Sequence, residues 1–200
     1  MTRFLLIRHA TTESVGKSLT GRSPGVPLNE EGKSQAQLLA QRLAVLPIAA
    51  IYSSPVERAL QTAELVAKVL QLSTLSNDDF LELNFGQWTG AGFDTLAADV
   101  QFQRFNSFRS NTRIPGGETM LEAQARMVRG LQALGEKHNG QTVAVVSHSD
   151  MIKAALAYYA GIPLDLFQRI EISPASVSIL EVYEETARIL VVNDRGGIRF

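Results

Sequence analysis

"FLLIRHATTES", residues 4–14, places a short apolar run directly before an arginine, a histidine and a polar segment. The apolar residues are contiguous rather than alternating, which is typical of a central strand that is covered on both faces. We therefore predict a buried strand at Arg3–Ile7, with Arg8 and His9 at its carboxyl end. Taken alone, this arginine–histidine pair could also be an ordinary solvated strand end.

Two more apolar runs predict strands of the same kind, "IAAIYS" at residues 48–53 and "QTVAVVSHS" at residues 141–149. Each brings side chains that can do chemistry: Ser54 and Arg58 follow the first run, and His148 lies at the end of the second. Because the carboxyl ends of parallel strands meet at one edge of a sheet, we expect these groups to share a crevice with the first arginine–histidine pair.

Helical patterns separate the strands, with apolar residues at helical spacing and turn residues at the ends. The predicted helices span residues 29–46, 55–70, 95–108, 118–138 and 151–160. Alternating strands and helices predict a three-layer α/β/α fold with a mainly parallel central sheet. Two or three closing strands are expected to add antiparallel pairs near the C-terminus. They lie at residues 168–172, 176–183 and 187–192.

The chain is expected to form a single domain, residues 1–200, with the histidines and arginines at its centre, because no linker, repeat or low-complexity tract divides it. Residues 77–117 are predicted to be a lid-like, partly helical insertion over the site. This insertion carries half of the aromatic side chains: Phe80, Phe85, Trp88, Phe93, Phe102, Phe105 and Phe108. They could form a small core of the insertion or line the leaving-group side of a pocket, and the sequence leaves both open.

Composition and charge argue against several classes of protein. The formal net charge is −1, with both signs spread along the chain, so nothing favours nucleic acid or an anionic membrane as a partner. The chain has no cysteine and therefore no disulfide or thiolate chemistry. We see no signal-peptide pattern and no apolar stretch of the ~20 residues that cross a bilayer, so a cytoplasmic location is expected.

The residues of the predicted crevice suit phosphoryl chemistry. A phosphoryl group in transfer carries negative charge on its equatorial oxygens, and arginine forks such as Arg8 and Arg58 bind such oxygens in pairs. A neutral imidazole, here His9 or His148, can attack phosphorus and hold the group covalently, which divides hydrolysis into two easier steps. The leaving alkoxide needs a proton, and Glu82 in "FLELNFGQW" is the candidate acid.

Five motifs occur in the order typical of the histidine phosphatase superfamily. They are "LIRHATTES", "SSPVERALQTAE", "LELNFGQWTG", "PGGET" and "VAVVSHSDMIKA". On these motifs, which extend from residue 5 to about residue 160, the chain resembles that superfamily and its phosphoglycerate-mutase-like clan with the RHG signature.

The resemblance implies a role for each matching residue. His9 would be the phosphorylated nucleophile, and Arg8 and Arg58 would clamp the phosphoryl oxygens. His148 would donate to an oxygen in the transition state, and Glu82 would be the general acid and later the base that activates water. The resemblance also implies an enzyme of the histidine acid phosphatase kind, a phosphoric monoester hydrolase that needs no metal and no other cofactor.

Three positions depart from the family pattern. Ala10 stands where glycine is usual after the first histidine, and Ser149 replaces the glycine after the second, where its hydroxyl could contact phosphate. Val15 replaces an asparagine that commonly binds phosphate in this family. The remaining candidate phosphate contacts are Thr12, Ser14, Thr20 and Gly21.

The identity of the general acid and the role of the two histidines each have an alternative interpretation. Asp78 and Asp79 lie close to Glu82 in the sequence, so all three could be solvated loop acids. A metal site built from the two histidines and Asp150 is conceivable, but the adjacent arginines would repel a cation.

The sequence therefore favours a metal-independent phosphomonoesterase that acts on a small phosphorylated metabolite through a phosphohistidine. A phosphoglycerate mutase would share the same site and return the phosphoryl group to substrate. A non-catalytic family member that binds a phosphorylated ligand or a protein is the alternative from another class. The chain could be a monomer or a homodimer, because the closing strands could end in solvent or pair with a second subunit.

Overall fold

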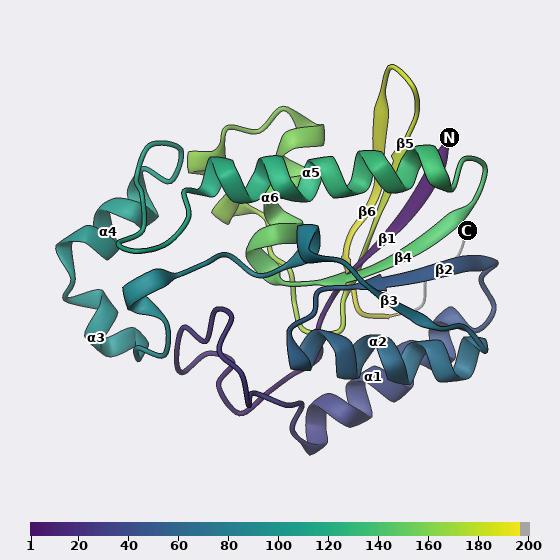
Figure 1. Cartoon of the computed structure of the whole chain (residues 1–200), viewed down its shortest axis with the longest axis horizontal. Helices are drawn as coiled ribbons and strands as arrows, with labels where there is room; N and C mark the ends of the chain where they lie inside the picture. Colours follow the sequence, from purple (N-terminus) through teal and green to yellow (C-terminus); the bar gives the residue numbers. More distant parts are fainter. Residues whose placement is uncertain (197–200) are drawn as a thin grey trace.

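The computed structural model describes residues 1–196 as a six-stranded sheet between two layers of helices (Figure 1). The strands are β1 (Thr2–Arg8), β2 (Ile48–Ser53), β3 (Thr74–Ser76), β4 (Thr142–Ser147), β5 (Val177–Val182) and β6 (Ala187–Asp194). Their order in the sheet is β3-β2-β4-β1-β5-β6. The pairs from β3 to β1 are parallel, and β5 and β6 are added antiparallel. The predicted fold class is confirmed.

Helices cover both faces of the sheet. They are α1 (Glu30–Leu43), α2 (Glu57–Leu70), α3 (Phe93–Ala97), α4 (Val100–Ser107), α5 (Met120–Lys137) and α6 (Ser149–Ala160). Leu5 and Ile7 of β1 pack with α1 and α2, whereas Phe4 and Leu6 pack with α5 and α6. Successive side chains of a strand point to opposite faces, so a strand covered on both sides needs apolar residues at every position.

Local sequence determines where the helices begin. The side chain of Asn29 accepts a hydrogen bond from the Gly32 N–H (2.8 Å), as expected of an N-cap. Thr119 and Glu122 form a reciprocal capping box at the start of α5. Asp99 caps α4 through the N–H groups of the first turn, and this cap divides the predicted helix 95–108 into α3 and α4.

Of the two or three closing strands that were expected, two are present, as β5 and β6. The segment 168–172 is not a strand: a 3-10 helix, Leu164–Arg169, occupies its beginning, and the chain then runs to Ile172 without pairing in the sheet. The Ile172 carbonyl instead accepts a hydrogen bond from the Arg8 side chain, so it is not available for pairing with a neighbouring strand. The short edge strand β3 was missed, because three partly polar residues give no pattern of their own.

The carboxyl ends of three neighbouring strands form one edge of the sheet. The His9 N–H after β1 donates to the Ser147 carbonyl of β4 (2.9 Å), and the Ser54 N–H after β2 donates to the Val146 carbonyl (2.9 Å). The helix after β1 packs on one face and the helix after β4 on the other, so this edge is a topological switch point. Figure 1 shows α3 and α4 beyond the ends of the strands, at the left of the view.

Candidate active site

His9 is buried at the end of β1 and has one defined tautomer. Its Nδ1 lies 2.8 Å from the Ala10 carbonyl, which can only accept, so Nδ1 carries the proton. The lone pair is then on Nε2, which accepts a hydrogen bond from Arg58 Nε (3.1 Å). Burial, together with the charges of Arg58 and Arg8, lowers the pKa of His9 well below its ordinary value. His9 is therefore neutral near pH 7, and its unprotonated Nε2 makes it a potential nucleophile.

Two arginines, the buried Arg58 and the partly buried Arg8, bring positive charge to the site. Arg58, in the first turn of α2, donates through Nη2 to the Gly21 carbonyl (2.8 Å), while its buried Nη1 has no partner. Arg8 donates through Nη1 to the Ile172 carbonyl (2.6 Å), while its buried Nε has no partner. Both arginines line the pocket that His9 lines, and two guanidinium groups in one pocket favour an anion as ligand.

His148, at the end of β4, lies behind Arg58. Its ring is 5.2 Å from that of His9 and fully buried, and its Nε2 lies 2.8 Å from Ser54 Oγ. Its Nδ1 lies 3.2 Å from Arg58 Nη2 and 3.6 Å from Glu82 Oε2. Burial and then the Arg58 charge lower the pKa of His148 well below its ordinary value. Donation from His148 to a phosphoryl oxygen stays a prediction.

Glu82 comes from the irregular segment after β3 and lines the same pocket. Its Oε1 accepts from the Leu83 N–H (2.8 Å), and its side chain is only 12% exposed. Burial raises the pKa of Glu82 to about 7, and the negative charge of Asp150 acts in the same direction, against the opposing effect of Arg58. A carboxyl group that titrates near neutral pH can donate a proton in one step and accept one in the next.

These residues enclose a small pocket with a volume of about 160 Å³. The predicted residues that line it are Arg8, His9, Thr12, Ser14, Thr20, Gly21, Arg58, Glu82 and Ser149. His148 is not part of the lining and contacts the site through Arg58. The other lining residues are Val15, Gly16, Ser18, Leu19, Phe85, Phe93 and Asp150. The structure thus brings together the residues that the sequence pointed to, from segments far apart in the chain.

A protein-family model described as "Histidine phosphatase superfamily (branch 1)" matches residues 4–195. The match covers nearly the whole chain. The chain belongs to the histidine phosphatase superfamily.

Similar proteins agree with this membership. "Phosphoserine phosphatase 1" of Hydrogenobacter thermophilus is 31% identical over 198 residues, covering 96% of this chain and 92% of the relative. "Phosphoglycerate mutase-like protein 4" of Arabidopsis thaliana is 31% identical over 155 residues, covering 75% and 67%. The solved structure of Bacillus stearothermophilus YhfR matches with a TM-score of 0.91 at 30% identity, covering 97% and 98%. This histidine phosphatase is an enzyme of the phosphatase type.

The lesser phosphate contacts predicted for this histidine phosphatase differ in what they touch. Thr12 Oγ1 accepts from the Ser14 N–H (3.3 Å), and Ser149 Oγ reaches the Ile172 carbonyl only at 3.5 Å. Gly21 uses its carbonyl to hold Arg58 in place. All of them line the pocket, and their roles as phosphate ligands stay predictions.

The aromatic residues of the insertion divide between core and pocket. Trp88 and Phe105 are 4% and 0% exposed and belong to the hydrophobic core on the α5 side of the sheet. Their rings pack together, and the Trp88 indole N–H donates to Asp99 (3.0 Å). Phe93, in contrast, is 38% exposed and lines the pocket. Phe85 lines the pocket as well, although it is only 4% exposed, so Phe93 and Phe85 are the aromatic side chains placed to meet a bound ester.

The supporting contacts of the site are a mixture of expected and unexpected residues. Ser54, expected in the crevice, bonds His148. Asp150, considered from the sequence only as a possible metal ligand, lines the pocket and accepts from Arg109 Nη1 (3.1 Å). Thr62 was not predicted: its Oγ1 accepts from the Ala10 N–H (3.0 Å) and fixes the backbone beside His9. Its partner lies 52 residues away, and no local pattern identifies it.

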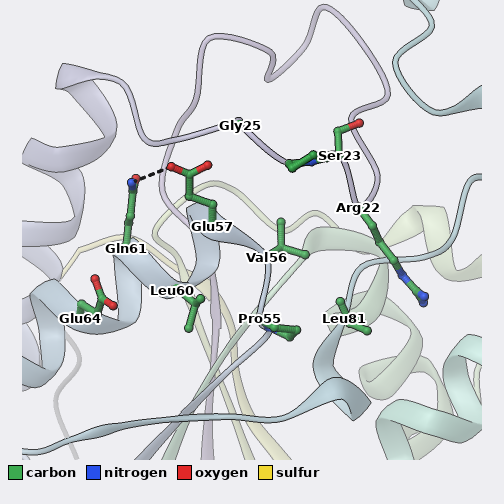
Figure 2. A pocket seen from close by; sticks show the side chains of 11 residues that line it. Arg22, Ser23, Gly25, Pro55, Val56, Glu57, Leu60, Gln61, Glu64 and Leu81 are labelled. Atoms are coloured by element: carbon green, nitrogen blue, oxygen red, sulfur yellow. Dashed lines mark hydrogen bonds between the residues drawn. The ribbon is translucent and has the colours of Figure 1, made fainter.

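A second, larger groove of about 530 Å³ lies between the loop at residues 22–25 and the beginning of α2 (Figure 2). Pro55, Val56 and Leu60 form its apolar floor, and none of the predicted catalytic residues lines it. The larger of these two cavities is therefore not the one that contains the predicted catalytic residues of this histidine phosphatase. The smaller pocket is the candidate active site because His9, Glu82 and the two arginines all line it.

Residues 1–196 contain no group of three or more histidine, cysteine or acidic side chains placed to hold a metal ion. Within the same range, no helix is both long and apolar enough to cross a lipid bilayer.

Proposed function

We propose that the protein is a metal-independent phosphomonoesterase that hydrolyses a small phosphorylated metabolite through a phosphohistidine on His9. The observation that carries the proposal is the unprotonated Nε2 of His9, which Arg58 Nε orients in a pocket that Arg8 and Arg58 also line. An incoming phosphoryl group would supply the electrophile, and its oxygens would accept hydrogen bonds from the two guanidinium groups. The small-molecule substrate and the expected cytoplasmic location are part of this proposal.

In the first step, His9 Nε2 attacks phosphorus and the bond to the ester oxygen breaks. The Ala10 carbonyl holds the Nδ1 proton and stabilises the positive charge that develops on the ring. Arg8 and Arg58 stabilise the equatorial oxygens in a site with little water. Glu82 gives its proton to the leaving oxygen, and the alcohol departs with Glu82 as a carboxylate.

In the second step, water attacks the phosphorus of phosphohistidine, and the bond between phosphorus and Nε2 breaks. Glu82 accepts the proton of that water, which returns the acid to its starting state. A carboxyl group with a pKa of about 7 has enough of both forms near neutral pH to serve in both steps.

The charges in the pocket support hydrolysis over mutase chemistry. Arg8 and Arg58 are the only arginines or lysines that line it among residues 1–196, and they are matched by the carboxyl groups of Glu82 and Asp150. A mutase must hold a doubly phosphorylated intermediate while that intermediate turns, which requires more anion ligands than two arginines. Val15, where the family commonly has asparagine, adds none.

Rapid mixing with ³²P-labelled ester, followed by quenching, tests the covalent step. We expect a labelled enzyme that is labile in acid and stable in base, and we expect His9→Ala to lose both label and turnover. His138→Ala is the matched control, because His138 bonds Tyr52 and Gln141 away from the pocket and should keep both. A label with the acid stability of a serine or threonine ester would contradict the proposal.

Two further measurements test the class of reaction. Activity should survive exhaustive chelation, since the arginines already supply the positive charge that a divalent ion would bring. Incubation with 3-phosphoglycerate and a bisphosphoglycerate primer should release phosphate without rapid isomerisation. Rapid formation of 2-phosphoglycerate with little phosphate release would favour the mutase alternative.

A further inference from the structure

Glu82 is supplied by a segment with almost no regular structure. Between β3 and α3, only two single-turn 3-10 helices, Asp78–Phe80 and Gly86–Trp88, order the backbone. A general acid must nevertheless be held in position, because a displacement of ~1 Å can reduce the rate by ~10²-fold. Side chains from elsewhere in the chain therefore have to fix this segment.

Three hydrogen bonds hold the backbone at and around Glu82. Arg22 Nε donates to the Glu82 carbonyl (2.7 Å). Arg126 Nη1 donates to the Leu81 carbonyl (2.9 Å), one residue earlier. The Asn84 N–H, two residues later, donates to a carboxylate oxygen (3.1 Å). The acid is thus held from both sides along the chain.

One carboxylate, that of Glu118, connects all three contacts. Its Oε1 accepts from Arg22 Nη2 (2.7 Å), and its Oε2 accepts from Arg126 Nη2 (3.1 Å) and from the Asn84 N–H. Burial acts to raise the pKa of Glu118, but the Asn84 N–H and the two guanidinium groups outweigh it, and the pKa is lowered. Glu118 therefore remains ionised and keeps both arginines oriented.

Gly117 of "PGGET" and Gly86 of the acid-bearing segment let the Glu118 carboxylate approach that segment. A Cβ at Gly117 would collide with the Asn84 carbonyl, and a Cβ at Gly86 would collide with the Pro115 carbonyl. Gly86 also has φ +47°, a conformation that disfavours other residues. The two backbones touch directly, so Glu118 is within reach of the amide two residues after the acid.

Arg22 connects the Glu118 contacts to the loop that also binds Arg58. Figure 2 shows its side chain leaving the loop and passing Leu81, away from the apolar floor of the larger groove. Its neighbour in the chain, Gly21, binds Arg58 through its carbonyl. The same loop therefore contacts the phosphate-binding arginine and the backbone of the acid.

We propose that Glu118 is a positioning residue for proton transfer: through Arg22, Arg126 and the Asn84 N–H it sets the distance between Glu82 and the leaving oxygen. This inference rests on the proposed role of Glu82 as the general acid. The hydrogen bonds of Glu118 go to neither His9 nor Arg58, so its removal should spare phosphoryl capture and impair protonation of the leaving group.

The test compares two esters in Glu118→Gln, which keeps the shape of the side chain and removes its charge. An alkyl phosphate needs the proton, whereas p-nitrophenyl phosphate releases a stable phenolate unaided. We expect kcat/KM to fall by ~10–100-fold for the alkyl ester and by less than about threefold for the aryl ester. In the double variant with Glu82→Gln, the alkyl loss should not exceed that of Glu82→Gln alone, because both changes remove the same proton transfer.

Glu122→Gln is the matched control. Glu122 lies in the first turn of α5, four residues after Glu118. It also pairs with an arginine, Arg113, but that pair is on the surface. It should leave the ratio of alkyl to aryl activity unchanged. If Glu118→Gln fails to fold by circular dichroism, Arg22→Met replaces it, because that variant removes only the bond to the Glu82 carbonyl and one Glu118 contact.

The outcomes separate this inference from the proposed function. Equal losses for the two esters in Glu118→Gln, with a leaving-group-dependent loss in Glu82→Gln, overturn the positioning role and leave the acid assignment standing. Equal losses in Glu82→Gln itself overturn the acid assignment, and the inference falls with it. An additive alkyl loss in the double variant also contradicts the inference.

Discussion

The two walls of the pocket are built in different ways. One wall comes from strand ends and the first turn of α2, and there His9, Arg58 and His148 are at most 4% exposed and bond one another directly. The other wall comes from the insertion, where Glu82 is held through its backbone and Phe93 is partly exposed. The wall that would carry the phosphoryl group thus has its reactive side chains in the core. In the wall that would meet the leaving group, core residues such as Phe80 and Leu83 anchor the segment, and polar contacts fix the backbone of Glu82.

The difference has a physical reason. A phosphoryl group has the same shape in every ester, so its ligands can be fixed by the sheet, whose hydrogen-bonded ladders leave little freedom. The leaving group varies between substrates, and surface segments can change without loss of the core. Four measurements test this difference between the two walls.

The largest effect is expected at the insertion wall, for substrates with a poor leaving group. Glu82→Gln should reduce hydrolysis of an alkyl phosphate by ~10²–10⁴-fold, because the alkoxide then leaves without a proton. The same variant should retain most of its kcat/KM on p-nitrophenyl phosphate, because kcat/KM reports the first chemical step and the phenolate leaves without a proton. Asp78→Asn and Asp79→Asn serve as controls and should leave both activities in place. Similar losses on both esters would assign Glu82 to structure.

The strand-end wall should respond without regard to the leaving group. Arg58→Met should reduce activity on alkyl and aryl esters alike, by ~10²–10³-fold, because it removes donors to the transferred group itself. The variant also leaves the buried Gly21 carbonyl without its donor, so calorimetry should show a lower Tm as well. A loss of activity confined to the alkyl ester would contradict the role of Arg58 in binding the transferred group.

The pH dependence should come from the insertion wall alone. The pKa of Glu82 is raised to about 7, so the carboxyl is protonated below that pH and loses its proton above it. Activity on an alkyl ester should therefore fall about tenfold per pH unit above 7. The ratio of wild-type to Glu82→Gln activity on one ester cancels the ionisation of the substrate. A ratio that stays flat between pH 5 and 9 would contradict this assignment.

The smallest effect is expected at the aromatic part of the insertion wall. Phe93→Ala should lower the preference for an aromatic over an aliphatic ester of similar leaving-group pKa by about two- to tenfold, which corresponds to ~0.5–1.5 kcal/mol. Phe108→Ala is the control, because Phe108 is exposed and does not line the pocket. An unchanged preference in Phe93→Ala would show that this side chain does not meet the leaving group.

The sequence alone predicted the strand-end wall. Contiguous apolar runs identify β1, β2 and β4, and parallel strands necessarily bring their carboxyl ends to one edge, so the order of residues along the chain suffices to group His9, Arg58 and His148. The start of α1 at Asn29 is predictable for a similar reason, since capping depends on residues that are neighbours in the chain. Such patterns repeat with the period of the backbone and can be detected locally.

The tertiary structure decided the rest. It placed Trp88 in the core and Phe93 at the pocket, although both are aromatic residues of one insertion. It also assembled the contacts of Glu118, which join residues 96 and 34 positions apart in the chain. Burial, the tautomer of His9 and the raised pKa of Glu82 depend on which groups surround a side chain in space, and a sequence specifies those neighbours only through the complete fold.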